Sequence, residues 1–514
     1  MSAFLPRARV SSTRLLASTA AILAAAGGFA ACADSLHLDP PGTTGGGGNT
    51  TTSQHTGGTS PGGCISSQDC GYPKAICDTV KAECVECVTH VDCSAVRPGT
   101  VCSFGVCSCP AEGDAAATVQ YCESPGGARC VDTATASSDC GGCNKPCYGS
   151  CVNSKCADPW RPITSDGAPS PRTRHVGVWA SSVKRMFIWG GRSSSGVLDT
   201  GGLYDPETNT WSPTSSLGAP SPRHGATAVW DDKENVVIVW GGLGPSDAPL
   251  DSGAIYDPAS DQWTALPTLN APSGRSAHSA VWATFSAPYQ GANHGMIVWG
   301  GDGGGFSLGD GALFDPAGAK WSAVDNTNGP SARSGHSAVW HDASQKMIVF
   351  GGIGATTPAE IYLSEGWTFA PATSTWTNVS GALPDPRARH TAVLTNASSM
   401  IVFGGFNGTS ALSDGATYLI STSAWAPLDP SPQPREGHTA LWLGTRMIVV
   451  GGDQNGNPHA SAWAYDPAAV SWAGLPALPV GRTHHTAVTD GTVMMVWGGD
   501  GSSGPLDSGA IYTP

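Results

Sequence analysis

An arginine opens each of seven repeated segments in the C-terminal part of the 514-residue chain. Guanidinium groups held in fixed positions can bind carboxylates through paired hydrogen bonds, so these arginines are candidate ligand-binding residues. They are Arg172, Arg223, Arg275, Arg333, Arg387, Arg435 and Arg482. The alternative is structural: a residue that recurs in every repeat can bind backbone carbonyl groups between neighbouring repeats. Recurrence in all seven segments favours this second interpretation.

Six of the segments continue as Arg-x-x-His, which raises the question of a metal site. The second segment departs from the pattern, with Ala226 at the histidine position and His224 beside its arginine. Histidines spread around a ring lie mostly too far apart to share one ion, whose ligands sit at about 2 Å. The segment from Asp453 begins like a calcium loop, but Pro458 stands where that loop requires glycine. We therefore expect no metal and no cofactor, and the sequence identifies no catalytic residue.

Cysteine is confined to the N-terminal part of the chain. Of the 17 cysteines, Cys32 stands apart and the other 16 all lie between Cys64 and Cys156. An even set at this density in an exported chain predicts disulfide bonds, although the spacing does not give their connectivity. Zinc is the alternative, since Cys84-x2-Cys87 has ligand-like spacing. We expect residues 64–156 to form a disulfide-rich module that acts as a spacer.

The first 32 residues are typical of an export signal. Arginines at the start precede an apolar run from Leu15 to Ala26, which is short for a membrane span. The run ends in Phe29-Ala30-Ala31-Cys32, which resembles the lipobox of bacterial lipoproteins, with Phe29 in place of the usual leucine. The resemblance implies that Cys32 is lipidated; the alternative is an ordinary secretory signal. Residues 33–63, rich in Gly, Thr and Ser, are expected to form a flexible linker.

A short apolar run that ends in Gly-Gly occurs seven times after residue 157. The doublets begin at Gly190, Gly241, Gly300, Gly351, Gly404, Gly451 and Gly498. A tryptophan follows each of the first six doublets, and several repeats carry a Tyr-Asp-Pro or Phe-Asp-Pro turn in between, as at Tyr204. Strand-length runs of β-branched and aromatic residues separated by turn residues predict an all-β repeat fold.

This order of apolar strand, Gly-Gly, Tyr-Asp-Pro and Trp resembles the kelch motif. The resemblance implies a β-propeller of four-stranded blades over residues 157–514. The seventh repeat ends without its tryptophan, whereas a tryptophan, Trp160, precedes the first complete repeat. Trp160 lies 15 residues before His175, and the same interval separates Trp263 from His278. We therefore expect a seven-bladed propeller in which the strand from Trp160 to Ile163 completes the last blade.

The formal net charge of −14 makes nucleic acid an unlikely partner. Copper oxidases of the kelch family need a cysteine cross-linked to tyrosine, and no cysteine follows Cys156, so that chemistry is excluded. In some kelch proteins the recurrent arginine faces the ligand.

Two longer segments, Ala283 to His294 and the region around Ser364 to Trp367, are further candidates for recognition loops, with drift of the repeat as the alternative.

The sequence therefore favours a monomeric, exported, lipid-anchored bacterial protein of the outer membrane or cell surface. Its propeller would be a binding or scaffold module for a protein or an acidic glycan. The alternative is an exported carbohydrate-active enzyme, such as a mutarotase or lyase, that uses Arg and His at the channel mouth. A purely structural role in the envelope is a third option. The lack of recurrent paired carboxylates favours binding over catalysis.

Overall fold

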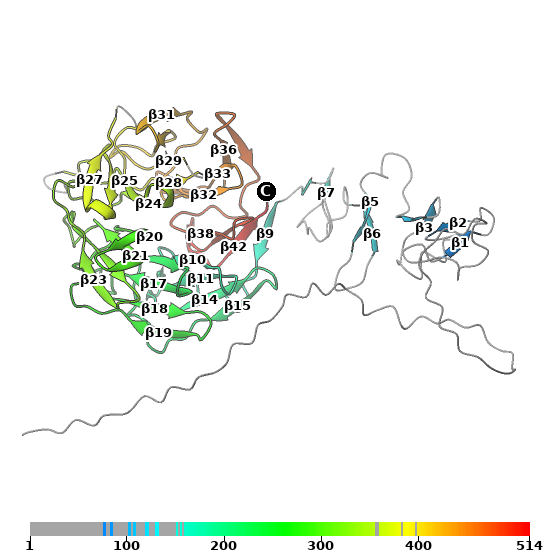
Figure 1. Cartoon of the computed structure of the whole chain (residues 1–514), viewed down its shortest axis with the longest axis horizontal. Helices are drawn as coiled ribbons and strands as arrows, with labels where there is room; N and C mark the ends of the chain where they lie inside the picture. Colours follow the sequence, from blue (N-terminus) through cyan, green and yellow to red (C-terminus); the bar gives the residue numbers. More distant parts are fainter. Residues whose placement is uncertain are drawn as a thin grey trace, which may run out of the picture. The chain divides into compact units, whose positions relative to one another are not determined.

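In the computed structural model, the described residues are 159–514, except 355–358, 382–383 and 396–397, together with eight short strands between Ile76 and Cys156. The larger part forms seven four-stranded antiparallel sheets arranged radially as blades (Figure 1). Each of the first six blades uses four strands in chain order from the inside outwards. The sequence prediction of an all-β, seven-bladed propeller is confirmed.

The strands are given by their position in blades 1 to 7. The first strands are β10 (Val176–Ala180), β16 (Thr227–Asp231), β20 (Ser279–Tyr289), β24 (Ser337–His341), β28 (Thr391–Leu394), β32 (Thr439–Leu443) and β38 (Thr486–Thr489). The second strands are β11 (Arg185–Trp189), β17 (Val236–Trp240), β21 (Ala292–Trp299), β25 (Lys346–Phe350), β29 (Ser399–Phe403), β33 (Arg446–Val450) and β39 (Met494–Trp497).

The third strands are β14 (Gly201–Asp205), β18 (Gly253–Asp257), β22 (Gly311–Asp315), β26 (Gly366–Ala370), β30 (Gly415–Leu419), β36 (Ala462–Asp466) and β42 (Gly509–Tyr512). The fourth strands are β15 (Thr210–Pro213), β19 (Gln262–Ala265), β23 (Lys320–Ala323), β27 (Thr375–Asn378), β31 (Ala424–Leu428), β37 (Ser471–Leu475) and β9 (Trp160–Ile163). Small hairpins β12–β13 (Arg192–Ser193, Gly196–Val197), β34–β35 (Asp453–Gln454, Asn457–Pro458) and β40–β41 (Asp500–Gly501, Gly504–Pro505) lie between second and third strands.

The core lies between the blades, because both faces of each sheet are covered by neighbours. The second strands show this most clearly: in β17 the side chains from Val237 to Trp240 have no exposed surface. Such continuous apolar runs of Val, Ile and aromatic residues are expected for strands that are buried on both faces. In several outer strands the tryptophan alone is buried, as Trp263 is in β19.

The propeller closes by pairing its first strand with its last. Strand β9 is antiparallel to β42, with Trp160 opposite Tyr512 and Ile163 opposite Gly509. The Trp160 ring is 2% exposed and lies 5.1 Å from the ring of Tyr512, and its Nε1 donates to the carbonyl of Pro476 at 2.7 Å. Blade 7 therefore contains β38, β39, β42 and β9, as the sequence predicts.

The segment from Ala283 to His294 extends the hairpin of β20 and β21 over blade 4. Phe285 packs edge-on against Trp340, and Tyr289 packs against Phe369. Thr284 donates to Asp342, which begins the 3-10 turn η3 (Asp342–Ser344). The aromatic residues of this insertion thus join two blades. The insertion in blade 4 belongs to the loop between β25 and β26.

The remaining strands form four two-stranded hairpins. They are β1–β2 (Ile76–Asp78, Glu83–Val85), β3–β4 (Val101–Ser103, Val106–Ser108), β5–β6 (Val119–Cys122, Arg129–Asp132) and β7–β8 (Cys151–Val152, Lys155–Cys156). In three of them two cysteines occupy opposed positions, as Cys77 and Cys84 do. The predicted signal with Cys32 and the linker lie outside the described residues, and the disulfide module stays a prediction. No helix among the described residues is long and apolar enough to span a membrane.

We predict that Trp160→Ala lowers the free energy of unfolding by about 3–5 kcal/mol, because the substitution leaves a large cavity at the closing strand. Trp263→Ala, which removes the corresponding side chain from blade 2, should cost a similar amount. Urea denaturation followed by tryptophan fluorescence measures both. Normal stability of Trp160→Ala beside a destabilised Trp263→Ala would contradict an integral closing strand.

Candidate functional site

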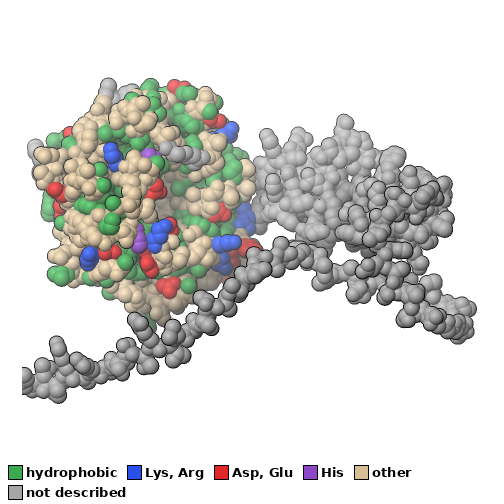
Figure 2. All heavy atoms as spheres, in the orientation of Figure 1, with side chains coloured by type: hydrophobic (Ala, Val, Ile, Leu, Met, Phe, Trp, Pro, Cys, Tyr) green, Lys and Arg blue, Asp and Glu red, His purple; other side chains and the backbone are tan. Residues whose placement is uncertain are grey.

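One face of the propeller gathers the recurrent motifs. In each blade the first strand starts and the second strand ends at this face, so the arginine segments, the Gly-Gly doublets and the loops after them all lie here. We call it the mouth face. Figure 2 shows, over one face of the propeller, basic, acidic and histidine side chains interspersed among hydrophobic ones.

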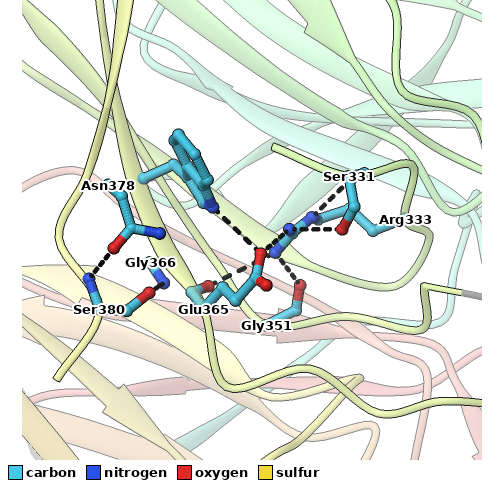
Figure 3. A network of polar contacts seen from close by, with 8 residues as sticks. Ser331, Arg333, Gly351, Glu365, Gly366, Asn378 and Ser380 are labelled. Carbon is cyan, nitrogen blue, oxygen red and sulfur yellow. Dashed lines mark hydrogen bonds and ion pairs between the residues drawn. The ribbon is translucent and has the colours of Figure 1, made fainter. Parts of the chain in front are cut away.

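The seven recurrent arginines are buried, with side chains 0–1% exposed. Each donates through Nη1 to the carbonyl of the first glycine of its own doublet, at 2.7–3.1 Å. Arg333 also donates to Ser331 and to the carboxylate of Glu365, which lies 2.8 Å from Nη2 (Figure 3). These contacts agree with the structural alternative, and a ligand-binding role for the arginines stays a prediction.

The Nη2 group of each of these arginines has one of two kinds of partner. Arg275, Arg333 and Arg387 form ion pairs with Asp310, Glu365 and Asp414. The other four meet a hydroxyl group at the same place, from Thr200, Ser252, Ser461 and Ser508. Burial lowers the pKa of these four, Arg172, Arg223, Arg435 and Arg482, to about 10, so they remain protonated at neutral pH.

The backbone conformation of the Gly-Gly doublet allows the arginine side chain to reach the carbonyl group of the first glycine. In all seven doublets the first glycine has φ between +63° and +73° and the second between +86° and +112°. A Cβ on Gly300 would lie 2.9 Å from the carbonyl oxygen of Arg333, and one on Gly301 would lie 2.8 Å from that of Ser276. Only glycine fits this conformation and this close approach.

The six recurrent histidines join neighbouring blades. Each places Nε2 at 2.7–2.9 Å from a serine or threonine hydroxyl in the preceding blade. In the preceding blade, this hydroxyl group belongs to the residue that directly follows the recurrent histidine position. Blade 2 has Ala226 instead of histidine, and blade 1 has Val176 instead of a hydroxyl residue. Both partners are therefore replaced together, and the two apolar side chains belong to one hydrophobic cluster.

Burial keeps these histidines neutral. It lowers the pKa of His175, His278, His390 and His438 to about 3, and nearby arginines contribute in the same direction. For His336 and His485 the pKa is also well below its ordinary value, for the same reasons. At six of the seven junctions, a neutral histidine whose Nε2 is hydrogen-bonded to a hydroxyl group is a structural contact.

The residues two positions after each arginine form what we call the mouth ring: Arg174, Gly225, Ala277, Gly335, Arg389, Gly437 and His484. Their backbones bond from blade to blade, for example from the N–H of Gly225 to the carbonyl of Arg174 at 2.8 Å. All seven have positive φ, between +50° and +63°. Glycine adopts this conformation at little cost, whereas Arg174, Ala277, Arg389 and His484 are strained.

Sequence reasoning missed the mouth ring as a source of surface side chains. A signal was present, because three of the seven repeats carry glycine at this position and three carry a basic residue or histidine. Arg389 forms an ion pair with Glu436 at 2.9 Å and lies 5.8 Å from the centre of the Phe406 ring. The Phe406 ring in turn packs against Tyr362. These contacts join blades 4, 5 and 6.

Two shallow depressions open on the mouth face. The first, of about 300 Å³, lies between blades 7 and 1, and Arg174, Arg192 and Asp500 are among its lining residues. The second, of about 310 Å³, is lined by Ser331, Ala332, Gly354, Ile361 and Leu363. Ile361, in the lining of the second depression, is 54% exposed, and Phe306 in the corresponding loop of blade 3 is 57% exposed.

The aspartates that follow three doublets shape their loops. Asp302 accepts from the backbone of Gly304 and Gly305, and Asp453 and Asp500 accept from Thr483 and Thr173. Among the described residues, no group of three His, Cys, Asp or Glu side chains is placed to hold a metal ion.

We predict that stability falls steeply below about pH 6.5. The histidines have lowered pKa values in the folded state, so the unfolded chain binds more protons between pH 6.5 and 3 and is favoured there. Each histidine contributes up to about 1.4 kcal/mol per pH unit. Urea denaturation at pH 7.5, 6.0 and 5.0 measures the slope.

The variant His278→Asn should show a shallower slope by one proton, because it removes one histidine whose pKa is lowered by burial. Equal slopes for His278→Asn and the parent protein would show that His278 does not contribute in this way.

Comparison with known proteins agrees with this architecture. A family model described as the KLHDC2/KLHL20/DRC7 Kelch-repeats domain matches residues 151–286, 270–428 and 354–512. Among curated proteins, the chain is 27% identical over 267 residues to Multiple epidermal growth factor-like domains protein 8 of Homo sapiens. It is 26% identical over 333 residues to human Host cell factor 2, and 26% identical over 282 residues to Acyl-CoA-binding domain-containing protein 4 of Arabidopsis thaliana.

These alignments cover 48%, 56% and 52% of the chain, but only 9%, 40% and 39% of the respective relatives. The similarity thus extends over a minor part of each relative. The family model, in contrast, covers more than half of this chain, and its matches coincide with the blades described above. The chain belongs to the kelch-repeat family.

Proposed function

We propose that this chain is a binding protein without catalytic activity, whose propeller takes up a partner protein on the mouth face. The kelch propeller is a protein-interaction scaffold, which supports the general class. The observation that carries the proposal is the combination, on this one face, of exposed apolar side chains with cationic side chains in strained backbone positions. Strain at exposed positions is more often associated with function than with stability.

A protein partner suits this surface better than an acidic glycan does. Ile361 and Phe306 offer aliphatic and aromatic surface to apolar side chains, and a depression lined by Ile361 and Leu363 lies alongside. Interfaces between proteins combine such apolar contacts with arginine and aromatic residues. Arg174, Arg389 and Phe406 supply the second component.

The enzymatic alternative has less support. It depended on the recurrent Arg and His side chains at the channel mouth, and these are buried and hydrogen-bonded to their own or neighbouring blades. A neutral histidine bonded to a threonine and an arginine bonded to carbonyl groups would have to leave those partners before acting on a substrate. Binding through other, exposed side chains requires no such rearrangement.

We further propose that the protein is exported and anchored by a lipid on Cys32 at a bacterial surface. The basic start, the apolar run and the small residues before Cys32 support this proposal. The cysteine-rich segment supports it independently, since a chain with 16 further cysteines between Cys64 and Cys156 suits an oxidising compartment.

To test binding, the full-length protein is used to capture proteins from envelope extracts, with quantification by mass spectrometry. We expect a partner that is enriched by the parent protein and reduced at least tenfold by the double variant Phe306→Ser, Ile361→Asp. The control Val470→Asp changes an exposed residue in the turn between β36 and β37, on the opposite face, and should retain the partner. Equal capture by the mouth variant, or glycan binding without a protein partner, would overturn the proposal.

For the anchor, we predict that Cys32→Ser moves the protein from the membrane fraction to the soluble fraction, because the acylated residue is lost. Cell fractionation and immunoblotting measure the distribution, with Ser35→Ala as the control. Membrane association of the Cys32→Ser variant equal to that of the parent would count against lipidation.

A further inference from the structure

The loop between β33 and β36, residues 453–461 of blade 6, departs from its counterparts in the other blades. In every blade, one residue of this loop donates its N–H to the second glycine of the doublet and accepts, through its carbonyl, from the N–H of the next blade's arginine. Blade 6 has His459 at this position, and the other six blades have leucine: Leu198, Leu250, Leu308, Leu363, Leu412 and Leu506. The backbone role of the position therefore does not require histidine.

A second departure in blade 6 lies beside the first. Four blades carry serine two positions before the recurrent arginine, and the serine hydroxyl accepts from Nη2 of that arginine. Blade 6 has Gln433 instead, and its Oε1 accepts from Nη2 of Arg435 at 3.2 Å and from the hydroxyl of Ser461 at 2.5 Å. Nε2 of Gln433 lies 2.9 Å from Nδ1 of His459. The two unusual residues of this blade thus contact each other.

The partners of Gln433 and His459 determine where the protons lie. The carbonyl oxygen of Pro434 can only accept, so Nε2 of His459, which lies 3.2 Å from it, carries a proton. In the neutral imidazole Nδ1 is then the acceptor, and the amide group of Gln433 donates to it. The amide cannot turn over, because its N–H groups would face the guanidinium group of Arg435, which has no acceptor.

A proton on Nδ1 of His459 is incompatible with this arrangement. Nδ1–H and the amide N–H of Gln433 would then be two donors facing each other, at the 2.9 Å that now separates the two nitrogen atoms. Because the Gln433 amide is held by Arg435 and Ser461, the histidine side chain is the partner that has to move. His459 is partly exposed, so a proton reaches it from solvent while the protein is folded.

The charged groups around His459 act in both directions. Burial lowers its pKa and the guanidinium group of Arg435 lowers it further, whereas the hydrogen bond to Pro434 and the carboxylate of Asp453 act in the opposite direction. From blade 7, the guanidinium group of Arg482 is turned to its own doublet and to Ser508. Since the pKa of His459 is lowered in the folded state, its contact with Gln433 is present above about pH 6.5 and is lost as the pH falls below that value.

We propose that Gln433 and His459 form a proton-operated switch on the mouth face, which loosens the blade 6 loop in acid. When Nδ1 of His459 binds a proton, the two donors separate and the imidazolium group turns from Gln433 to solvent. The loop loosens with it, because the N–H and carbonyl groups of His459 hold the loop to Gly452 and to Arg482 of blade 7. The switch works in the free protein and does not depend on the proposed partner.

The first test follows the protonation of His459 by NMR in the full-length protein, with histidine labelled at Cε1. The His459 signal is the one that is missing from His459→Leu, which installs the leucine of the other six blades. We expect His459 to titrate below pH 6.5 in the parent. In Gln433→Glu its midpoint should rise by at least one pH unit, because a carboxylate accepts from Nδ1–H and attracts the imidazolium. The other histidine signals are the control and should not shift.

The second test measures the loosening by hydrogen–deuterium exchange of residues 452–461, at pH 7.5 and at one pH unit below the measured midpoint, with correction for the intrinsic exchange rate. Protection of this segment in the parent should fall at least tenfold at the lower pH, and in His459→Leu it should change less than twofold. The matched control is the loop of blade 7, residues 499–508, which has a similar hairpin and carries Leu506. It should stay protected in both proteins.

A His459 midpoint at or above pH 6.5 in the parent, or one that Gln433→Glu leaves unchanged, would overturn the switch. So would full protection of the parent loop at the lower pH. Equal loss of protection in His459→Leu, or in the loop of blade 7, would assign the acid response to the recurrent buried histidines and would likewise contradict the proposal. None of these results bears on the proposed function, because capture of the partner is measured separately.

Discussion

Every blade depends on one arrangement at its Gly-Gly doublet. The carbonyl of the first glycine accepts from the arginine side chain of the same blade, and the N–H of the second glycine donates to the arginine carbonyl of the next blade at 2.8–2.9 Å. One arginine therefore fixes its own blade through its side chain and the preceding blade through its backbone. Because the contact needs φ values near +65° and +95°, the two glycines and the arginine act as a unit.

This arrangement places seven positive charges inside a protein with few charged residues. Carbonyl dipoles surround every guanidinium group, and carboxylates assist in blades 3, 4 and 5. The neighbouring histidines remain neutral, so no second positive charge is added at the junctions. Buried ionic groups are tolerated only when their hydrogen-bonding capacity is filled, and here the doublet carbonyls fill it in every repeat.

The regularity of the scaffold makes its exceptions informative. At the junction of blades 1 and 2, Val176 and Ala226 replace a hydroxyl and a histidine together, so neither member of this pair loses its partner there. At the mouth ring, Arg174 stands where three other blades have glycine, and it holds a positive φ of 52°. The first exception is explained by packing alone.

The sequence by itself determined the number of blades, the strand order and the closing role of Trp160, because each depends on the spacing of residues within a repeat and survives without knowledge of contacts. It also identified the recurrent arginines, but not whether they face a ligand or the backbone. Only the tertiary structure shows their partners within the chain, since those of Arg333 include Gly351 and Glu365, which become neighbours only when the blade has folded. Two further features could not be predicted from the sequence: the packing of the insertion at Phe285 onto blade 4, and the exposure of Arg174. Burial depends on residues of other blades, which no local pattern encodes.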